Sequence, residues 1–269
     1  MKQIITDSET GARLRVLSEP SAVRPMIVIC PGGGYRLLSP REGEPVARAF
    51  QAEGFGTAVL EYEVGGEGLM YRPMRGLAWA VRHIREHAGT YGADPRQIFV
   101  CGFSAGGHVA GLLGASWDNV QVFPDPMEGR ASRPDGLILC YPVVTAGKWR
   151  HEGSFQRLCA DPARWEGFSV ETLVGPGMPP VFLWHTAEDD MVPVQNSLLL
   201  ANALAAQGIS WELHVFPRGV HGLSLATREV DEPEKGRLAD PRVAQWLLLA
   251  AQWVRERCGQ EERQYLKSL

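Results

Sequence analysis

Short apolar runs alternate along the chain with longer segments in which apolar residues recur every three or four positions. The run 26–30, Met-Ile-Val-Ile-Cys, is typical of a strand buried on both faces of a parallel sheet. Segment 73–87 places Leu77, Val81 and Ile84 on one face of a predicted helix. The alternation of such strands and helices predicts an α/β fold with a mostly parallel central sheet and helices on both faces.

The same patterns predict the remaining elements. Residues 3–5 and 13–17 are expected to form an N-terminal hairpin, and Asp94 with Pro95 predicts a turn before the strand 97–101. The other predicted strands are 56–62, 136–141, 181–185 and 211–216, and the other predicted helices are 45–52, 104–115, 193–206 and 241–257.

Residues 143–180, called the insertion below, interrupt this alternation. The insertion carries large aromatic side chains among basic ones, namely Trp149, Phe155, Trp165 and Phe168. We interpret it as a short, partly helical cap over the carboxyl edge of the sheet; the alternative is a surface excursion with its own small apolar cluster. Since α/β chains of this length often form one domain, we expect residues 1–269 to be a single domain with this cap insertion.

Composition narrows the class of protein. The chain has 45% hydrophobic and 22% charged residues and a net charge of −4, and it has no run of Lys and Arg, so we expect no nucleic-acid partner. No apolar stretch suits a signal peptide or a membrane span. The five cysteines favour reduced thiols and a cytoplasmic protein.

The histidines do not predict a metal site. His83 and His87 lie four residues apart on a predicted helix but lack a third ligand, so we expect no metal, and no cofactor is expected either. The oligomeric state stays open.

Residues 102–106 read Gly-Phe-Ser-Ala-Gly, a G-x-S-x-G pattern between a predicted strand and a predicted helix. A serine on such a sharp turn exposes its hydroxyl above the sheet, and the helix N-terminus favours negative charge beside it. Gly102 and Gly106 have no side chain where the helix and the strand would pass closely. The pattern therefore predicts that Ser104 is a nucleophile; the alternative is an ordinary helix-capping serine.

A serine nucleophile needs a base, and the base needs an orienting carboxylate. In a parallel sheet these groups gather on the loops that follow the carboxyl ends of strands. His221 follows the predicted strand 211–216 and is the candidate base. Three acids follow the predicted strand 181–185 and are the candidate carboxylates, namely Glu188, Asp189 and Asp190.

The glycine-rich turn after residues 26–30 suits an oxyanion hole. Glycines at 32–34 let the backbone fold tightly and direct N–H groups into the site, with the N–H of Ala105 as the partner donor. A phosphate-binding loop is the alternative for such a turn. The chain continues Tyr35-Arg36-Leu37, however, which matches neither the Walker motif nor the dinucleotide fingerprint.

Together these motifs resemble the α/β-hydrolases, over nearly the whole chain. Residues 31–35, Pro-Gly-Gly-Gly-Tyr, resemble the H-G-G-G oxyanion stretch of the esterase and lipase branch, with proline in place of histidine. Residues 102–108 resemble that branch's nucleophile elbow, residues 185–193 its acid loop, and residues 221–222 its catalytic histidine turn.

The resemblance implies an α/β-hydrolase fold and a catalytic triad of Ser104, Asp189 and His221. In the family the acid stands four residues before a proline, which selects Asp189, with Asp190 as the runner-up. It also implies that the backbone N–H groups of Gly33, Gly34 and Ala105 bind the oxyanion.

These motifs look most like those of small esterases that remove acetyl or other short acyl groups, including acetylxylan and feruloyl-type esterases. The expected partner is therefore a small-molecule or acylated-sugar ester. Tyr35, Leu37 and the aromatic residues of the insertion are candidates to contact it; the alternative is that the same residues only pack as a cap.

Two other functions stay open at this point. One is a serine peptidase of the prolyl-oligopeptidase type, which usually carries a large N-terminal propeller; only 25 residues precede the run 26–30 here. The other is a non-catalytic hydrolase-fold binding protein, and such proteins usually lack a triad member.

Overall fold

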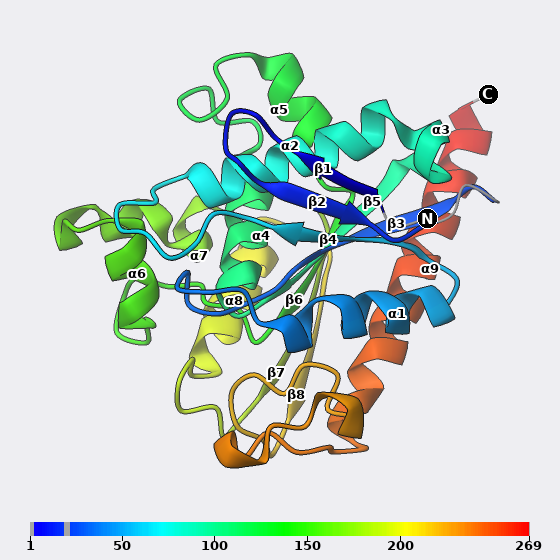
Figure 1. The fold of residues 1–269 in the computed structure, drawn as a ribbon. Coiled ribbons are helices and arrows are strands. Elements are labelled where there is room, and N and C mark those ends of the chain that lie inside the picture. The colour runs from blue at the N-terminus through cyan, green and yellow to red at the C-terminus, as the bar shows by residue number, and fades with distance from the viewer. Residues whose placement is uncertain (1–2, 19–21, 269) are drawn as a thin grey trace.

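The computed structural model describes residues 3–18 and 22–268, with side chains as far as residue 259. Its centre is an eight-stranded sheet in the order β1-β2-β4-β3-β5-β6-β7-β8 (Figure 1). The strands β1 and β2 pair antiparallel with each other, β2 pairs antiparallel with β4, and all later neighbours pair parallel. The strands are β1 (Gln3–Thr6), β2 (Arg13–Val16), β3 (Arg24–Cys30), β4 (Gly56–Glu61), β5 (Ala93–Phe103), β6 (Gly136–Cys140), β7 (Val181–Thr186) and β8 (Trp211–Phe216).

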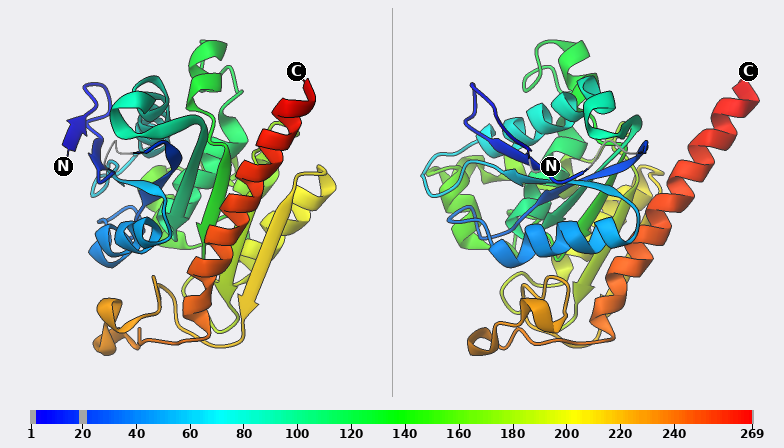
Figure 2. Two further views of the ribbon diagram at one scale, coloured as in Figure 1. Left: turned by 90° about the vertical axis from the view of Figure 1, so that its right-hand side faces the viewer. Right: turned by 45° about the vertical axis from the view of Figure 1, so that its right-hand side comes forward.

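Helices cover both faces of the sheet (Figure 2). They are α1 (Glu44–Ala52), α2 (Arg72–Glu86), α3 (Ala88–Tyr91), α4 (Ala105–Ser116), α5 (Pro126–Ser132), α6 (Glu152–Leu158), α7 (Val170–Leu173), α8 (Gln195–Ala206) and α9 (Trp246–Ser268). Short 3-10 turns are η1 (Pro40–Glu42), η2 (Pro162–Phe168), η3 (Arg228–Val230), η4 (Pro233–Lys235) and η5 (Val243–Gln245).

Strand β3 shows why the sheet needs both helical layers. Its side chains point alternately to the two faces, and residues 26–30 are all fully buried. Val28 packs in one apolar core with residues of α2, α4 and α8, whereas Ile27 and Ile29 pack in a second core with residues of α1 and α9. The predicted α/β class, with a mostly parallel sheet and helices on both faces, is confirmed.

Most element boundaries agree with the sequence patterns, and the N-terminal hairpin is confirmed. The turn predicted at Asp94 and Pro95 is wrong, because β5 already begins at Ala93. The register shifts between the pairings of Arg24 and Met26 with β5, and Asp94 Oδ1 accepts a hydrogen bond from the N–H of Arg96 at 2.9 Å. Asp94 and Pro95, residues typical of turns, therefore lie in a bulge inside β5. The short helices α3 and α5 had no clear apolar period and were not predicted.

The insertion packs against α4 through its aromatic side chains. Phe155, Trp165 and Phe168 are buried in the apolar core, with the rings of Phe155 and Trp165 5.9 Å apart. The Phe168 carbonyl accepts a hydrogen bond from His108 Nε2 at 2.7 Å. These aromatic residues thus anchor the insertion to the sheet layer, and its action as a cap over a substrate stays a prediction, as does the single-domain division of the chain.

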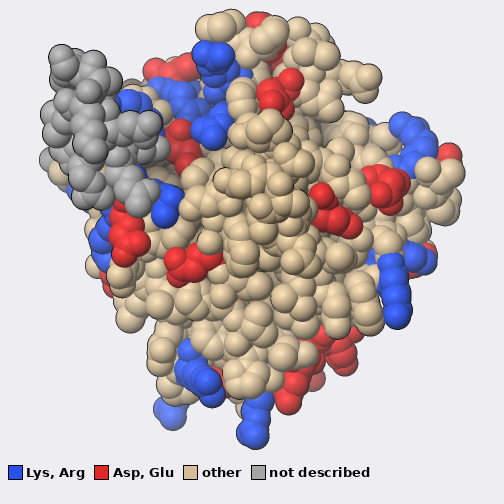
Figure 3. Space-filling view, turned by 180° about the vertical axis from the view of Figure 1, so that it is seen from behind, with Lys and Arg blue, Asp and Glu red and all other residues tan. Residues whose placement is uncertain are grey.

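Three properties of the described residues bear on possible partners. On the face shown in Figure 3, Lys and Arg side chains are interspersed with Asp and Glu side chains. No helix within residues 3–18 and 22–268 is both long and apolar enough to cross a membrane. Over the same residues, no group of three His, Cys, Asp or Glu side chains is arranged to hold a metal ion.

Candidate active site

Ser104 lies on a strained turn between β5 and α4. Its φ is 51° and its ψ is −117°, a conformation that residues with a side chain rarely adopt. The turn fits because glycines stand two residues before and two residues after Ser104. A Cβ on Gly106 would collide with the Cys30 carbonyl, and a Cβ on Gly102 would collide with the carbonyl of Gly106. The Ser104 N–H donates to the Cys140 carbonyl of β6 at 3.0 Å. The sheet therefore fixes the direction of the hydroxyl.

Three side chains from separate loops form a buried hydrogen-bonded chain. Ser104 Oγ lies 2.8 Å from His221 Nε2, and His221 Nδ1 lies 2.6 Å from Asp189 Oδ2. Asp189 follows β7 and His221 follows β8, so adjacent parallel strands deliver them to the same edge of the sheet as Ser104. The structure thus brings together the three residues predicted as a triad, while their catalytic roles stay a prediction.

The surroundings of Asp189 favour its ionised form. Burial alone would raise the pKa of Asp189, but hydrogen bonds from His185 and His221 outweigh it and hold the pKa of this carboxyl well below its usual value. The backbone N–H groups of Val192 and Met191 donate to Oδ1 at 2.9 and 3.1 Å. Asp189 is therefore a fixed negative charge behind the imidazole of His221.

The other two candidate acids lie elsewhere. Asp190 and Glu188 are both exposed, whereas Asp189 is 4% exposed. Glu188 Oε2 instead accepts a hydrogen bond from the Gly219 N–H at 3.3 Å. Of the three neighbouring acids, Asp189 is the one that contacts His221.

The glycine-rich turn lies beside Ser104. Gly33 and Gly34 have φ values of 133° and 61°, which glycine adopts without strain, and both line the cavity that contains Ser104. Ala105 directly follows Ser104 and is fully buried at the start of α4. Within the described part of the chain, the N–H groups of Gly33, Gly34 and Ala105 donate to no protein acceptor. Their role as oxyanion donors stays a prediction.

Sequence reasoning missed a buried carboxylate that links the loops of the site. Glu42 of η1 accepts hydrogen bonds from the Gly32 N–H at 2.9 Å and from the Tyr141 hydroxyl at 2.7 Å. The same hydroxyl accepts from the Ser224 N–H at 2.9 Å, and the Tyr141 ring lies edge-on to His221. Burial and the nearby Glu42 charge raise the pKa of Tyr141, which keeps it a donor. No local sequence pattern predicts these hydrogen bonds, because Glu42 and Tyr141 are 99 residues apart.

Two arginines fasten the loop that carries His221. Arg41 donates to the carbonyls of Gly222, at 2.8 Å, and Val230, at 2.7 Å. Arg237 donates to the His221 carbonyl at 2.8 Å and to Glu232 at 2.6 Å. The loop after β8 is thereby joined to η1, which follows the glycine-rich turn.

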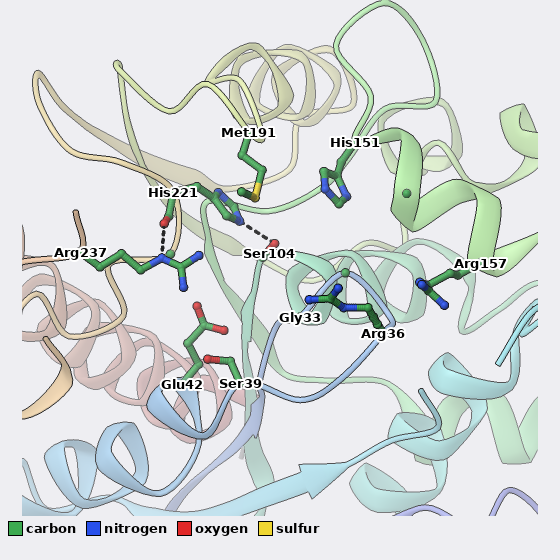
Figure 4. Close-up of a pocket in the computed structure, with 13 residues that line it drawn as sticks. Gly33, Arg36, Ser39, Glu42, Ser104, His151, Arg157, Met191, His221 and Arg237 are labelled. Atoms are coloured by element: carbon green, nitrogen blue, oxygen red, sulfur yellow. Dashed lines mark hydrogen bonds between the residues drawn. The ribbon is translucent and has the colours of Figure 1, made fainter. Parts of the chain in front are cut away.

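The cavity over Ser104 has a volume of about 350 Å³ (Figure 4). Its walls come from the glycine-rich turn, the loops after β7 and β8, and the insertion, which contributes the polar side chains of His151 and Arg157. Sequence reasoning assigned no role to either residue. The lining residues are Gly33, Gly34, Arg36, Ser39, Glu42, Ser104, His151, Gly153, Arg157, Met191, His221, Gly222 and Arg237.

The structure does not bring Tyr35 and Leu37 to this cavity, although both were candidates to contact the substrate. Tyr35 is fully buried, and its hydroxyl lies 2.8 Å from His108 Nδ1. Leu37 is 43% exposed but lies outside the cavity lining. Tyr35 instead joins the glycine-rich turn to α4, because its hydroxyl is a polar group that needs a partner inside the core.

Burial of His108 makes stability depend on pH. Burial lowers the pKa of His108 to about 4, although the hydrogen bond to the Phe168 carbonyl opposes this effect. Between about pH 6.5 and pH 4 the unfolded chain therefore binds a proton at His108 that the folded chain does not, and stability falls as the pH falls. From pH 7 to pH 5 we expect this residue to account for a loss of about 2 kcal/mol of unfolding free energy.

Urea unfolding of the wild type and His108→Gln at pH 7 and pH 5 measures this loss. The variant is expected to be less stable at pH 7, because it loses buried hydrogen bonds, and to lose less stability on acidification. Equal losses in the two proteins would show that His108 does not titrate in this way.

Comparisons with known proteins match this chain to two families and to solved hydrolase structures. Residues 16–135 match the family described as BD-FAE, and residues 169–236 match the prolyl oligopeptidase family. Among solved structures, an acetyl ester-xyloside bifunctional hydrolase from Caldicellulosiruptor lactoaceticus is 36% identical with a TM-score of 0.79, over 91% of this chain and 88% of that one.

Two curated relatives are similar over about three quarters of this chain. Endo-1,4-beta-xylanase B of Butyrivibrio fibrisolvens is 40% identical over 212 residues, which are 77% of this chain and 33% of the relative. Acetylxylan esterase of Xylanibacter ruminicola is 26% identical over 213 residues, 75% of this chain and 41% of the relative. The chain therefore spans about a third to two fifths of the length of these relatives.

Proposed function

Since this chain belongs to the α/β-hydrolase superfamily, in its esterase branch, we propose that it hydrolyses short-chain carboxylic esters through an acyl-enzyme on Ser104. The chain is an ester hydrolase by its family. The observation that carries the finer assignment is the buried chain Ser104–His221–Asp189, with distances of 2.8 and 2.6 Å.

In the first half of the proposed reaction, Ser104 Oγ attacks the ester carbonyl carbon and passes its proton to His221 Nε2. The ionised Asp189 stabilises the imidazolium that forms. The N–H groups of Gly33, Gly34 and Ala105 bind the oxyanion, each such donor being typically worth about 3 kcal/mol of barrier. Collapse of the tetrahedral intermediate breaks the ester bond, and His221 returns the proton to the departing alcohol.

In the second half, water attacks the acyl-enzyme. His221 takes a proton from this water, the hydroxide adds to the acyl carbon, and the oxyanion forms again in the same place. Cleavage of the bond to Ser104 Oγ releases the carboxylic acid, and His221 reprotonates the serine. No cofactor takes part in either half.

The cavity walls favour a short acyl group. Among the described lining residues, Met191 has the one large apolar side chain; the others are glycine, polar or charged. A long acyl chain would gain little from burial against such walls. The names of the relatives, acetylxylan esterase among them, support an acetylated carbohydrate as the substrate.

We do not propose a xylanase activity for this chain, although one relative has that name. A glycosidase needs two carboxylates facing each other across the scissile bond. Glu42 is the carboxylate among the lining residues that the structure describes, and it is bound to Gly32 and Tyr141. Two thirds of that relative's length lies outside the matched part, since the match covers 33% of it.

A series of substrates tests this function. We expect kcat/KM for p-nitrophenyl esters to fall at least about tenfold from acetate to octanoate, because each added methylene meets a polar wall. Acetylated xylose should be hydrolysed, and aminoacyl anilides, the peptidase substrates, should not. A rate that rises with acyl length, or preferred cleavage of the anilides, would contradict the proposal.

A further inference from the structure

Cationic side chains concentrate in the cavity of a protein whose net charge is −4. Three arginines, Arg36, Arg157 and Arg237, line the same space as Ser104. Figure 4 shows Arg36 and Arg157 on one side of Ser104 and Arg237 on the other. They come from three separate parts of the chain: the loop after β3, α6 of the insertion, and the loop after β8.

Arg237 already has structural partners. It forms an ion pair with Glu232 at 2.6 Å and donates to the His221 carbonyl at 2.8 Å. Glu42, the lining carboxylate, is likewise held by Gly32 and Tyr141. These two groups therefore serve the framework of the site.

Arg36 and Arg157 differ from Arg237 in this respect. Over the residues that the structure describes, neither guanidinium forms a hydrogen bond or an ion pair. Arg157 is half-buried, and Arg36 is exposed beside the turn that holds Gly33 and Gly34. An anion bound in this cavity would be attracted to both positive charges.

We propose that the ester substrate carries an anionic group, a carboxylate or a phosphate, which Arg36 and Arg157 bind beside Ser104. The planar guanidinium presents paired N–H donors that match two oxygens of either anion. This inference rests on the proposed function, because it assumes that the ester carbonyl of the same molecule lies at Ser104.

Matched pairs of esters test the proposal. The half-ester of adipate with p-nitrophenol and p-nitrophenyl hexanoate have acyl parts of equal length that differ in a terminal carboxylate. The acetyl esters of m-hydroxybenzoate and m-hydroxybenzamide place the same difference in the alcohol. The acetyl ester of m-hydroxyphenyl phosphate then separates phosphate from carboxylate recognition.

In at least one pair, we expect kcat/KM to be about tenfold or more higher for the anionic ester at low salt. The double variant Arg36→Gln, Arg157→Gln should bring the ratio of anionic to neutral kcat/KM close to one. The double variant Arg130→Gln, Arg242→Gln is the matched control, since it removes two exposed charges outside the cavity and should keep the wild-type ratio.

Binding to Ser104→Ala, measured by calorimetry, separates this inference from the proposed function. The adipate half-ester should bind about tenfold more tightly than the hexanoate ester. Tighter anion binding without ester hydrolysis by the wild type would reject the proposed function and leave Arg36 and Arg157 as an anion site alone. Ser104-dependent hydrolysis with equal rates within every pair and equal affinities would overturn the inference alone, as would a preference that survives loss of both arginines.

Discussion

Replacing Ser104 by alanine should lower kcat for p-nitrophenyl acetate by on the order of 10⁵-fold, with the fold retained. The substitution removes the Oγ that His221 Nε2 contacts at 2.8 Å and leaves the backbone bond from the Ser104 N–H to the Cys140 carbonyl in place. The oxyanion donors also remain, so the residual rate should still exceed the uncatalysed one.

The measurement is burst and steady-state release of p-nitrophenol, with circular dichroism and thermal unfolding as the controls for folding. A wild-type burst that is absent from the variant would support an acyl-enzyme on Ser104. A folded Ser104→Ala protein that retains more than about a tenth of the activity would place the nucleophile elsewhere.

Asp189→Asn should lower kcat by about 10⁴-fold. The asparagine oxygen can still accept from the N–H groups of Val192 and Met191, which now bond Oδ1. Its NH₂ group would then face His221 Nδ1 and stabilise the tautomer that carries its proton on Nε2. That tautomer cannot take the proton of Ser104, so the geometry would survive while the base is lost.

Asp190→Asn and Glu188→Gln are the matched controls, because each removes one negative charge from the same loop at an exposed position. We expect each to change kcat less than about threefold. A larger loss for Asp190→Asn than for Asp189→Asn would move the acid by one position along the chain.

Local signals predicted much of the fold. The buried strand β3 is readable from five consecutive apolar residues, because both of its faces pack against helices. The elbow at Ser104 is readable because its glycines are needed where β5 and α4 pass closely. The acid and histidine loops are readable because adjacent parallel strands end at the same edge of the sheet.

Features that depend on long-range contacts were not predictable in this way. Glu42 is a single acid on a short turn, and its partner Tyr141 belongs to a distant strand end. Tyr35 was expected to face a substrate, yet its direction depends on His108 in α4. The insertion likewise buries Phe155, Trp165 and Phe168 and turns other side chains to the cavity, His151 and Arg157 among them. The sequence of the insertion alone does not determine which of its side chains face the cavity.

Arg41 helps to order the loops of the site when the chain folds, before any substrate binds. Its bonds to the Gly222 and Val230 carbonyls join the loop of His221 to η1, and Glu42 of η1 holds the Gly32 N–H. These loops therefore lose their conformational entropy once, when the chain folds, and not again at each turnover. The free energy of substrate binding then remains available to stabilise the transition state, as in a preorganised catalyst.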